Sequence, residues 1–131
     1  MTRQALGPAI ALISVLISMP SFAGGDAAAG KKVFTRCMAC HDATSEQDRV
    51  GPHLLGVIGR AAGSAPSYLS RYSQAMKDAG GGGLVWSEAT LTDYLRAPKA
   101  KVPGNKMGFA GLKDDADIAN VIAYLKADPK P

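Results

Sequence analysis

The stretch RCMACHDA, residues 36–43, contains both cysteines of the 131-residue chain, Cys37 and Cys40, and one of its two histidines, His41. Four kinds of chemistry fit such a cluster: a small disulfide, a redox-active dithiol, a zinc site, or covalent attachment of a haem. Each makes a different demand on the rest of the chain. The other segments therefore decide which chemistry applies, and with it the fold.

Residues 1–23 have the layout of a cleaved secretory signal. Arg3 precedes an apolar run over residues 9–19, and the sequence Ser-Phe-Ala places small residues at positions −3 and −1 of a cut after Ala23. The run is about half of the ~20 residues that a membrane-spanning helix needs, although an uncleaved anchor is the alternative. We expect export to the periplasm and a single mature domain over residues 24–131.

The composition excludes one class of function and favours another. The formal net charge is +4, a mild basic excess, whereas a nucleic-acid-binding domain needs a strong, clustered basic patch. Aromatic residues make up only 6% of the chain, which is a small supply of large side chains for a core. A bound apolar cofactor would help to fill the interior.

Four segments predict α-helices, and none shows the alternating pattern of a strand. The predicted helices cover residues 26–40, 73–80, 87–98 and 114–129. Asp26, Ser73 and Ser87 are suitable N-caps, and Pro98 ends the third helix. Long irregular segments separate the helices, including residues 99–111. Long ordered loops in so small a domain indicate that the chain folds around something.

Three of the four interpretations of the cysteines fit poorly. A disulfide between residues three apart closes so small a loop that it removes little entropy from the unfolded chain. A thioredoxin-like dithiol needs a βαβ pattern, which is missing. A zinc site needs about four ligands, and the candidates are Cys37, Cys40, His41 and His53, of which Cys40 and His41 are adjacent and awkward in one shell.

The sequence Cys-x-x-Cys-His is the attachment signature of haem c. Two thiols about one helical turn apart can each add to one of the two vinyl groups on adjacent pyrroles. His41, next in sequence, is then carried under the iron as an axial ligand. Export fits this interpretation, because haem c is attached outside the cytoplasm.

A second axial ligand would close the iron site and favour electron transfer over ligand binding. Met38 lies inside the attachment loop and cannot reach the other haem face, and Met76 lies on a core-like stripe of a short helix. Met107 lies in KVPGNKMGF, between turn residues. It is either the second ligand or a methionine that anchors its loop by packing.

Nearly the whole mature chain resembles the soluble, mitochondria-like bacterial cytochromes c, which are class I c-type cytochromes. The matching segments occur in family order: GKKVF, CMACH, GPHLLGVIGR, YSQAMK, a lone Trp86, LTDYLRAPK, VPGNKMGF and VIAYL. The resemblance implies an all-α cytochrome c fold, in which about four helices and long loops wrap around one haem c bound covalently through Cys37 and Cys40.

The resemblance also implies roles for individual residues. Met107 is the sixth iron ligand opposite His41, and the Pro52 carbonyl accepts a hydrogen bond from the His41 ring. The residues matching family positions around the haem are Arg60, Tyr72 and Trp86 at the propionates, Tyr94 near the methionine sulfur, and Asn105 at a small polar position near the haem. The residues matching the family contact between the first and last helices are Gly30, Phe34, Val121 and Tyr124. Because two extra residues precede Tyr72, Tyr68 competes for its role. His53 is interpreted as a solvent-side or loop histidine.

The function that this implies is a periplasmic one-electron carrier that cycles between Fe(III) and Fe(II), not an enzyme. Partners would be membrane redox complexes (a cytochrome bc complex, a terminal oxidase or a reaction centre) or soluble oxidoreductases with acidic docking patches. We expect a monomer with no small-molecule substrate and no nucleic-acid partner. The basic residues expected to form a docking collar are Arg36, Arg96, Lys99, Lys101, Lys106 and Lys113. Alternatives are a haem c subunit of a periplasmic oxidoreductase and a ligand-binding or peroxidatic haem protein.

Overall fold

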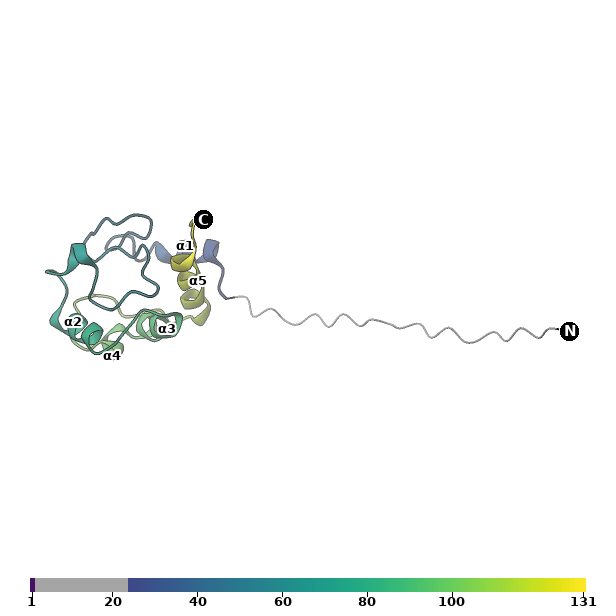
Figure 1. The fold of residues 1–131 in the computed structure, drawn as a ribbon. Coiled ribbons are helices and arrows are strands. Elements are labelled where there is room, and N and C mark those ends of the chain that lie inside the picture. The colour runs from purple at the N-terminus through teal and green to yellow at the C-terminus, as the bar shows by residue number, and fades with distance from the viewer. Residues whose placement is uncertain (2–23) are drawn as a thin grey trace.

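The computed structural model of the chain describes Met1 and residues 24–131, so the predicted signal and its cleavage site lie outside the described residues. Within them the chain forms helices and no strand, apart from a single antiparallel bridge between Ala61 and Val85. In chain order the helices are α1 (Ala27–Phe34), the 3-10 helix η1 (Pro66–Tyr68), α2 (Gln74–Gly81), α3 (Glu88–Arg96), α4 (Pro98–Lys101) and α5 (Asp115–Lys126) (Figure 1). The predicted all-α class is confirmed.

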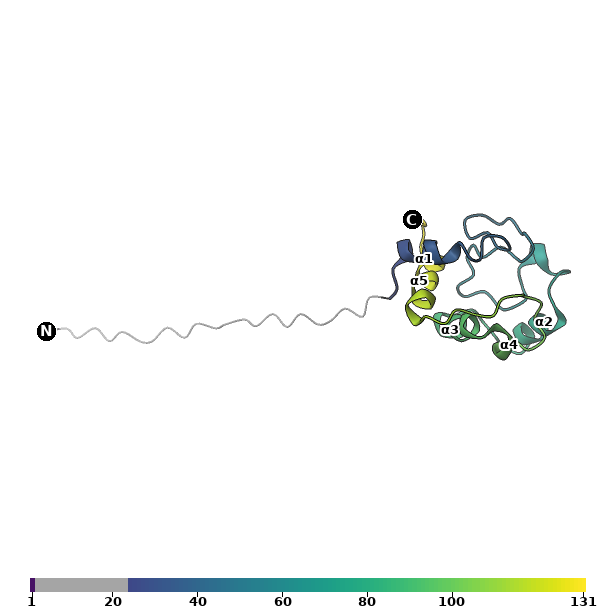
Figure 2. The same ribbon diagram turned by 180° about the vertical axis from the view of Figure 1, so that it is seen from behind.

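The helices are arranged at one end and along one side of the domain. Helices α1 and α5 cross where the described chain begins, and α3, α4 and α2 follow along one side (Figures 1 and 2). The long segment between α1 and η1 runs along the opposite side in both views. None of the helices in the described part of the chain is long and apolar enough to cross a membrane.

The crossing of α1 and α5 depends on a glycine. Asp26 caps α1 by accepting two backbone N–H groups of the first turn at 2.8 and 3.2 Å. A Cβ atom added to Gly30 would lie 1.8 Å from the backbone oxygen of Asn120 on α5, so only glycine allows this approach. The rings of Phe34 and Tyr124 meet beside it, with centroids 5.3 Å apart. The predicted contact between the first and last helices is confirmed.

Helix α5 contributes most to the core. Its buried residues are Ile118, Val121, Ile122, Tyr124 and Leu125, which is the face that the apolar spacing predicts. Burying each large aliphatic side chain is worth about 1.5–3 kcal/mol. Asp114 caps the helix by accepting the N–H groups of Ala116 and Asp117.

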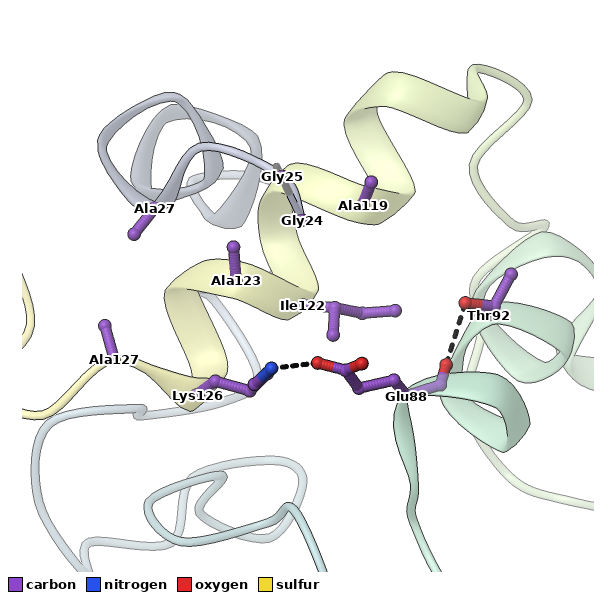
Figure 3. Close-up of a pocket in the computed structure, with 10 residues that line it drawn as sticks. All are labelled: Gly24, Gly25, Ala27, Glu88, Thr92, Ala119, Ile122, Ala123, Lys126 and Ala127. Carbon is purple, nitrogen blue, oxygen red and sulfur yellow. Dashed lines mark hydrogen bonds and ion pairs between the residues drawn. The ribbon is translucent and has the colours of Figure 1, made fainter. Parts of the chain in front are cut away.

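A surface cleft of about 420 Å³ lies between Gly24, α3 and α5 (Figure 3). An ion pair between Lys126 on α5 and Glu88 on α3 lies along it, with Ile122 nearby. A second cleft, of about 580 Å³, shares Lys126 and continues toward Leu55 and Pro129. No residue predicted to bind a cofactor or iron lines either cleft.

Helix α1 is shorter than predicted. It ends at Phe34, and residues 35–40 form turns in which the N–H groups of Arg36 and Cys37 donate to carbonyls three residues earlier. The prediction of a helix through residue 40 is therefore wrong at its C-terminal end. These turns contain both cysteines of the Cys-x-x-Cys-His sequence.

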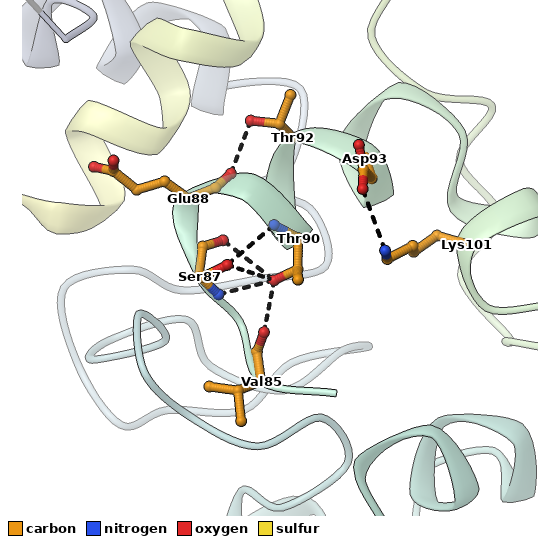
Figure 4. Close-up of polar contacts among 7 residues, drawn as sticks. All are labelled: Val85, Ser87, Glu88, Thr90, Thr92, Asp93 and Lys101. Atoms are coloured by element: carbon orange, nitrogen blue, oxygen red, sulfur yellow. Dashed lines mark hydrogen bonds and ion pairs between the residues drawn. The ribbon is translucent and has the colours of Figure 1, made fainter. Parts of the chain in front are cut away.

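The starts of α2 and α3 follow the predicted caps. The Ser73 hydroxyl accepts the Met76 N–H at 3.1 Å. At α3, Ser87 and Thr90 form a capping box, in which each side chain accepts the backbone N–H of the other residue, at 3.1 and 2.8 Å (Figure 4). The Thr90 hydroxyl also donates to the Val85 carbonyl, so the cap holds the preceding segment.

Pro98 starts a helix as well as ending one. The sequence predicts a loop over residues 99–111, but residues 98–101 form the short helix α4. Proline is suited to a first helical turn, where its missing N–H has no partner to lose. An ion pair between Lys101 and Asp93, 3.2 Å apart, joins α4 to α3 (Figure 4). The described residues thus contain five α-helices, one more than predicted.

Candidate functional site

Two hydrogen-bonded turns position the cysteines. The N–H groups of Cys40 and His41 both donate to the Cys37 carbonyl, at 3.0 and 2.9 Å. The two thiols are half-buried and are not joined by a disulfide. Burial raises the pKa of the Cys37 thiol, and the neighbouring Arg36 only partly offsets this. The disulfide interpretation is therefore not supported.

The His41 ring is held in one orientation. Its Nδ1 lies 2.7 Å from the Pro52 carbonyl oxygen, which only accepts, so Nδ1 carries the proton and Nε2 is the nitrogen left for a metal. Burial lowers the pKa of His41 more than this hydrogen bond raises it, which favours the neutral imidazole that binds iron. A Cβ at Gly51 would lie 2.3 Å from the ring's Cε1 atom, so the ring packs directly on backbone.

The loop that carries Met107 is built by a buried amide. The Asn105 side chain donates to the carbonyls of Pro98 and Val102 at 3.0 and 2.8 Å, and its oxygen accepts the Met107 N–H at 2.9 Å. The Lys99 ammonium donates to the Asn105 carbonyl. Asn105 therefore shapes the loop around Met107, which is how it contributes to the site.

Tyr94 contacts the methionine sulfur, as the resemblance implies. Its hydroxyl lies 3.9 Å from Met107 Sδ, within the range of a hydrogen bond to sulfur. Burial raises the pKa of Tyr94 to about 12, so the hydroxyl keeps its proton at neutral pH. The Trp86 ring packs on Tyr94 with centroids 4.8 Å apart, which fixes the phenol from its other side.

The structure distinguishes the two competing tyrosines. The Tyr68 hydroxyl donates its single proton to the Val50 carbonyl. The Tyr72 hydroxyl accepts the Ala65 N–H at 3.3 Å, so its own proton remains available. Burial raises the pKa of Tyr72 and keeps that proton in place. This favours Tyr72 as the donor to a carboxylate, while Tyr68 ties two loops together.

Of the two predicted settings for His53, the loop is confirmed and the solvent-facing one is wrong. The residue is 8% exposed, and Arg60 donates a hydrogen bond from Nη2 to its backbone carbonyl at 2.8 Å. Arg60 itself is half-buried. A histidine in a polar loop gives no periodic sequence signal of burial.

The donors present suit a c-type haem. Two thiols three residues apart, a neutral imidazole with a free Nε2 and a loop-held thioether are the groups that such a cofactor requires. In contrast, no three histidine, cysteine, aspartate or glutamate side chains within residues 24–131 come together as metal ligands, which argues against the zinc interpretation.

Residues 27–127 match the family described as Cytochrome c. The chain belongs to the cytochrome c family. It is 51% identical over 110 residues to a cytochrome c2 of Agrobacterium tumefaciens (strain II Chrys), a match covering 82% of this chain and 97% of that protein. It is similar in structure to cytochrome cH from Methylobacterium extorquens, with a TM-score of 0.70, 48% identity, and coverage of 78% of this chain and 98% of that one. It is also similar in structure to cytochrome c2 from Rhodospirillum centenum, with a TM-score of 0.74 and 37% identity. That match covers 82% of this chain and 100% of the other.

Membership of the cytochrome c family establishes the class of function. This protein is an electron carrier that works between redox partners, and it is not an enzyme. It carries one covalently bound haem c, for which Cys37 and Cys40 of the Cys-x-x-Cys-His sequence supply the thiols.

Proposed function

We propose that this member of the cytochrome c family is an exported periplasmic one-electron carrier with His41 and Met107 as axial ligands. The haem, when bound, supplies an iron that cycles between Fe(III) and Fe(II). His41 offers Nε2 because Pro52 holds its other nitrogen, and this contact makes the imidazole a better donor. Met107 offers a soft thioether, which stabilises ferrous iron and raises the reduction potential. The contact of Tyr94 with Met107 Sδ is the observation that carries this proposal.

A closed iron site is the form that favours electron transfer. A ligand-binding or peroxidatic protein would need Met107 to be absent or displaced. Here Asn105 holds the Met107 backbone and Tyr94 holds its sulfur. Both ligands can stay in place in both oxidation states, so little rearrangement accompanies each transfer.

The haem propionates need neutralising partners, because a buried carboxylate without one is costly. We assign this role to Arg60, Tyr72 and Trp86. The half-buried guanidinium of Arg60 and the available proton of Tyr72 support it. The burial of Trp86 against Tyr94 links this region to the methionine side.

Export is proposed from the sequence of residues 1–23 and supported by the start of the folded unit. The family match begins at residue 27, and α1 is capped at Asp26, directly after the proposed mature start at Gly24. A domain over residues 24–131 that functions in the periplasm is consistent with both.

Partners are proposed to be a membrane cytochrome bc complex, a terminal oxidase or a reaction centre, or soluble oxidoreductases with acidic patches. Half of the expected docking collar is already paired: Arg36 with Asp117, Arg96 with Asp115 and Lys101 with Asp93. Lys99, Lys106 and Lys113 instead donate to backbone carbonyls around the Met107 loop. We expect their positive charge to steer docking to that side.

The double variant Lys106→Gln, Lys113→Gln should slow electron transfer from a purified, acidic-patched cytochrome bc complex to the oxidised protein roughly tenfold at low ionic strength. Its rate should also depend less on salt than that of the unchanged protein. Lys126→Gln is the matched control, since Lys126 lies at the distant α3–α5 cleft. Stopped-flow rates measured against salt test this. A salt-independent rate in the unchanged protein would contradict electrostatic docking.

The double variant Cys37→Ser, Cys40→Ser should lose all haem staining on a denaturing gel, because no thioether bond remains. Each single variant keeps one thiol and should retain a weaker stain. Met107→Ala serves as the control, since it removes a proposed iron ligand and neither tether, and it should stain fully. Full staining of the double cysteine variant would refute covalent attachment at these residues.

A further inference from the structure

The backbone that packs on the His41 ring is weakly anchored by its own side chains. Gly51 has none and lies directly on the ring, since a Cβ there would be 2.3 Å from the ring's Cε1 atom. Val50, the residue before it, is 68% exposed, so burial does little to hold it. Pro52, the residue after it, accepts the Nδ1–H of His41. Backbone hydrogen bonds must therefore fix this segment, and one of them runs from the Gly51 N–H to the Cys40 carbonyl at 2.8 Å.

Other hydrogen bonds hold the same segment from its opposite side. The Tyr68 hydroxyl donates to the Val50 carbonyl. The Arg71 guanidinium donates from Nη2 to the Arg49 carbonyl at 2.7 Å and, more weakly, to the Val50 carbonyl at 3.4 Å. Both donors come from η1 and the turn that follows it, 18 to 22 residues further along the chain. Two side chains from a different loop thus hold the backbone carbonyls next to Gly51.

The two donors are themselves held in place. The guanidinium carbon of Arg71 lies 4.4 Å from the centre of the Tyr68 ring, which is a cation–π contact. Tyr68 is only 8% exposed, and the Tyr72 ring packs edge-on against it with centroids 4.9 Å apart. The Tyr68 hydroxyl and the Arg71 guanidinium therefore act as one rigid pair of donors.

We propose that Tyr68 and Arg71 are positioning residues for His41. Acting through the backbone of residues 49–52, they keep Gly51 against the imidazole and the Pro52 carbonyl aligned with its Nδ1–H. This rests on the proposed ligation of iron by His41. A well-made hydrogen bond at Nδ1 makes Nε2 a stronger donor. A stronger donor favours the ferric state, which carries the greater positive charge, so this pair of residues lowers the reduction potential and protects the Nδ1 proton from exchange.

The test starts with Tyr68→Phe, which keeps the ring and removes only the donating hydroxyl. In the reduced, haem-loaded protein, nuclear magnetic resonance should show a shifted His41 Nδ1–H signal that exchanges with solvent about fivefold faster, as expected for the loss of one net hydrogen bond. The midpoint potential should rise. Arg71→Lys keeps the positive charge but loses the planar fork, and should change all three quantities in the same direction. The double variant should exceed either single one.

Two controls separate positioning from a general loss of stability. Leu69→Ala alters a 49% exposed side chain between the two donors and should change none of the three quantities. Gly30→Ala, at the crossing of α1 and α5, should lower the unfolding midpoint while leaving the Nδ1–H signal and the potential as they are in the unchanged protein.

An unaltered Nδ1–H signal and potential in the double variant would overturn the role of Tyr68 and Arg71 and leave the ligation by His41 standing. The same conclusion would follow if Gly30→Ala reproduced both changes. If the His41 ring protons of the reduced, unchanged protein lacked the ring-current shift of a haem ligand, the proposed ligation would itself be refuted, and this inference with it.

Discussion

Replacing Met107 with alanine should abolish the methionine-to-iron charge-transfer band of the oxidised protein and lower its reduction potential by on the order of a few hundred millivolts. This is a substantial part of the ~0.8 V range that axial ligands cover. The reason is the loss of a soft thioether from a loop that Asn105 and Tyr94 hold in place. The open position should also allow added imidazole or cyanide to bind. Near-infrared absorption and a spectroelectrochemical titration measure both effects.

Met76→Ala is the matched control for this prediction. Met76 is the half-buried methionine of α2, packed against the core beside Ala75 and Ala79. Its truncation should reduce stability but leave the charge-transfer band in place. If the band survived in Met107→Ala and disappeared in Met76→Ala, the ligand assignment would be wrong.

Gly30→Ala should destabilise the fold by about 3 kcal/mol or more, the upper part of the range for overpacking. The added methyl would lie 1.8 Å from the Asn120 oxygen and 2.9 Å from the Tyr124 Cβ atom, so α1 and α5 would have to separate. Backbone cannot give way as a flexible side chain can. Denaturant unfolding of the haem-loaded protein, read as a lower midpoint with an unchanged slope, measures the loss.

Gly81→Ala makes the same chemical change where there is room. A Cβ at Gly81, the last residue of α2, would meet no atom within 4 Å. Alanine is favoured over glycine in helices by up to about 1 kcal/mol, so this variant should be neutral or slightly more stable. Equal destabilisation by the two substitutions would show that the contact of α1 with α5 is not what makes Gly30 necessary.

Local signals predicted the helix starts well. Asp26, Ser73 and Ser87 cap helices where the sequence places them, because a capping side chain acts within its own turn. The apolar stripe of α5 was equally informative. The end of α1 was not, since Cys37 continues the apolar spacing of Val33 even though its backbone has already turned.

Proline gives an ambiguous signal, which explains the missed helix α4. Pro98 correctly predicts the end of α3, but the same residue is suited to a first turn. What stabilises the four-residue helix lies outside it. Asp93 pairs with Lys101, and the Asn105 side-chain amide donates a hydrogen bond to the Pro98 carbonyl. Such tertiary partners leave no periodic trace in the sequence.

At the site, the resemblance placed the residues and the structure added their arrangement. The contacts of His41 with Pro52 and of Tyr94 with Met107 are those that it implies. The sequence could not separate Tyr72 from Tyr68, because the choice depends on which hydroxyl has already donated its proton. Nor could it predict the burial of His53, whose backbone N–H and carbonyl are hydrogen-bonded to Asp48 and Arg60.

The crossing of α1 and α5 also has a topological consequence. The N–H of Asp26 donates to the side chain of Asn120, 94 residues later. The close contact between α1 and α5, which requires Gly30, therefore joins residues that are far apart in the sequence. Closing a flexible loop of that length costs roughly 4 kcal/mol of chain entropy, which only the completed interface returns. Removing either α1 or α5 would therefore remove this closure between the first and last helices. Because its ends already meet, it is a natural candidate for circular permutation.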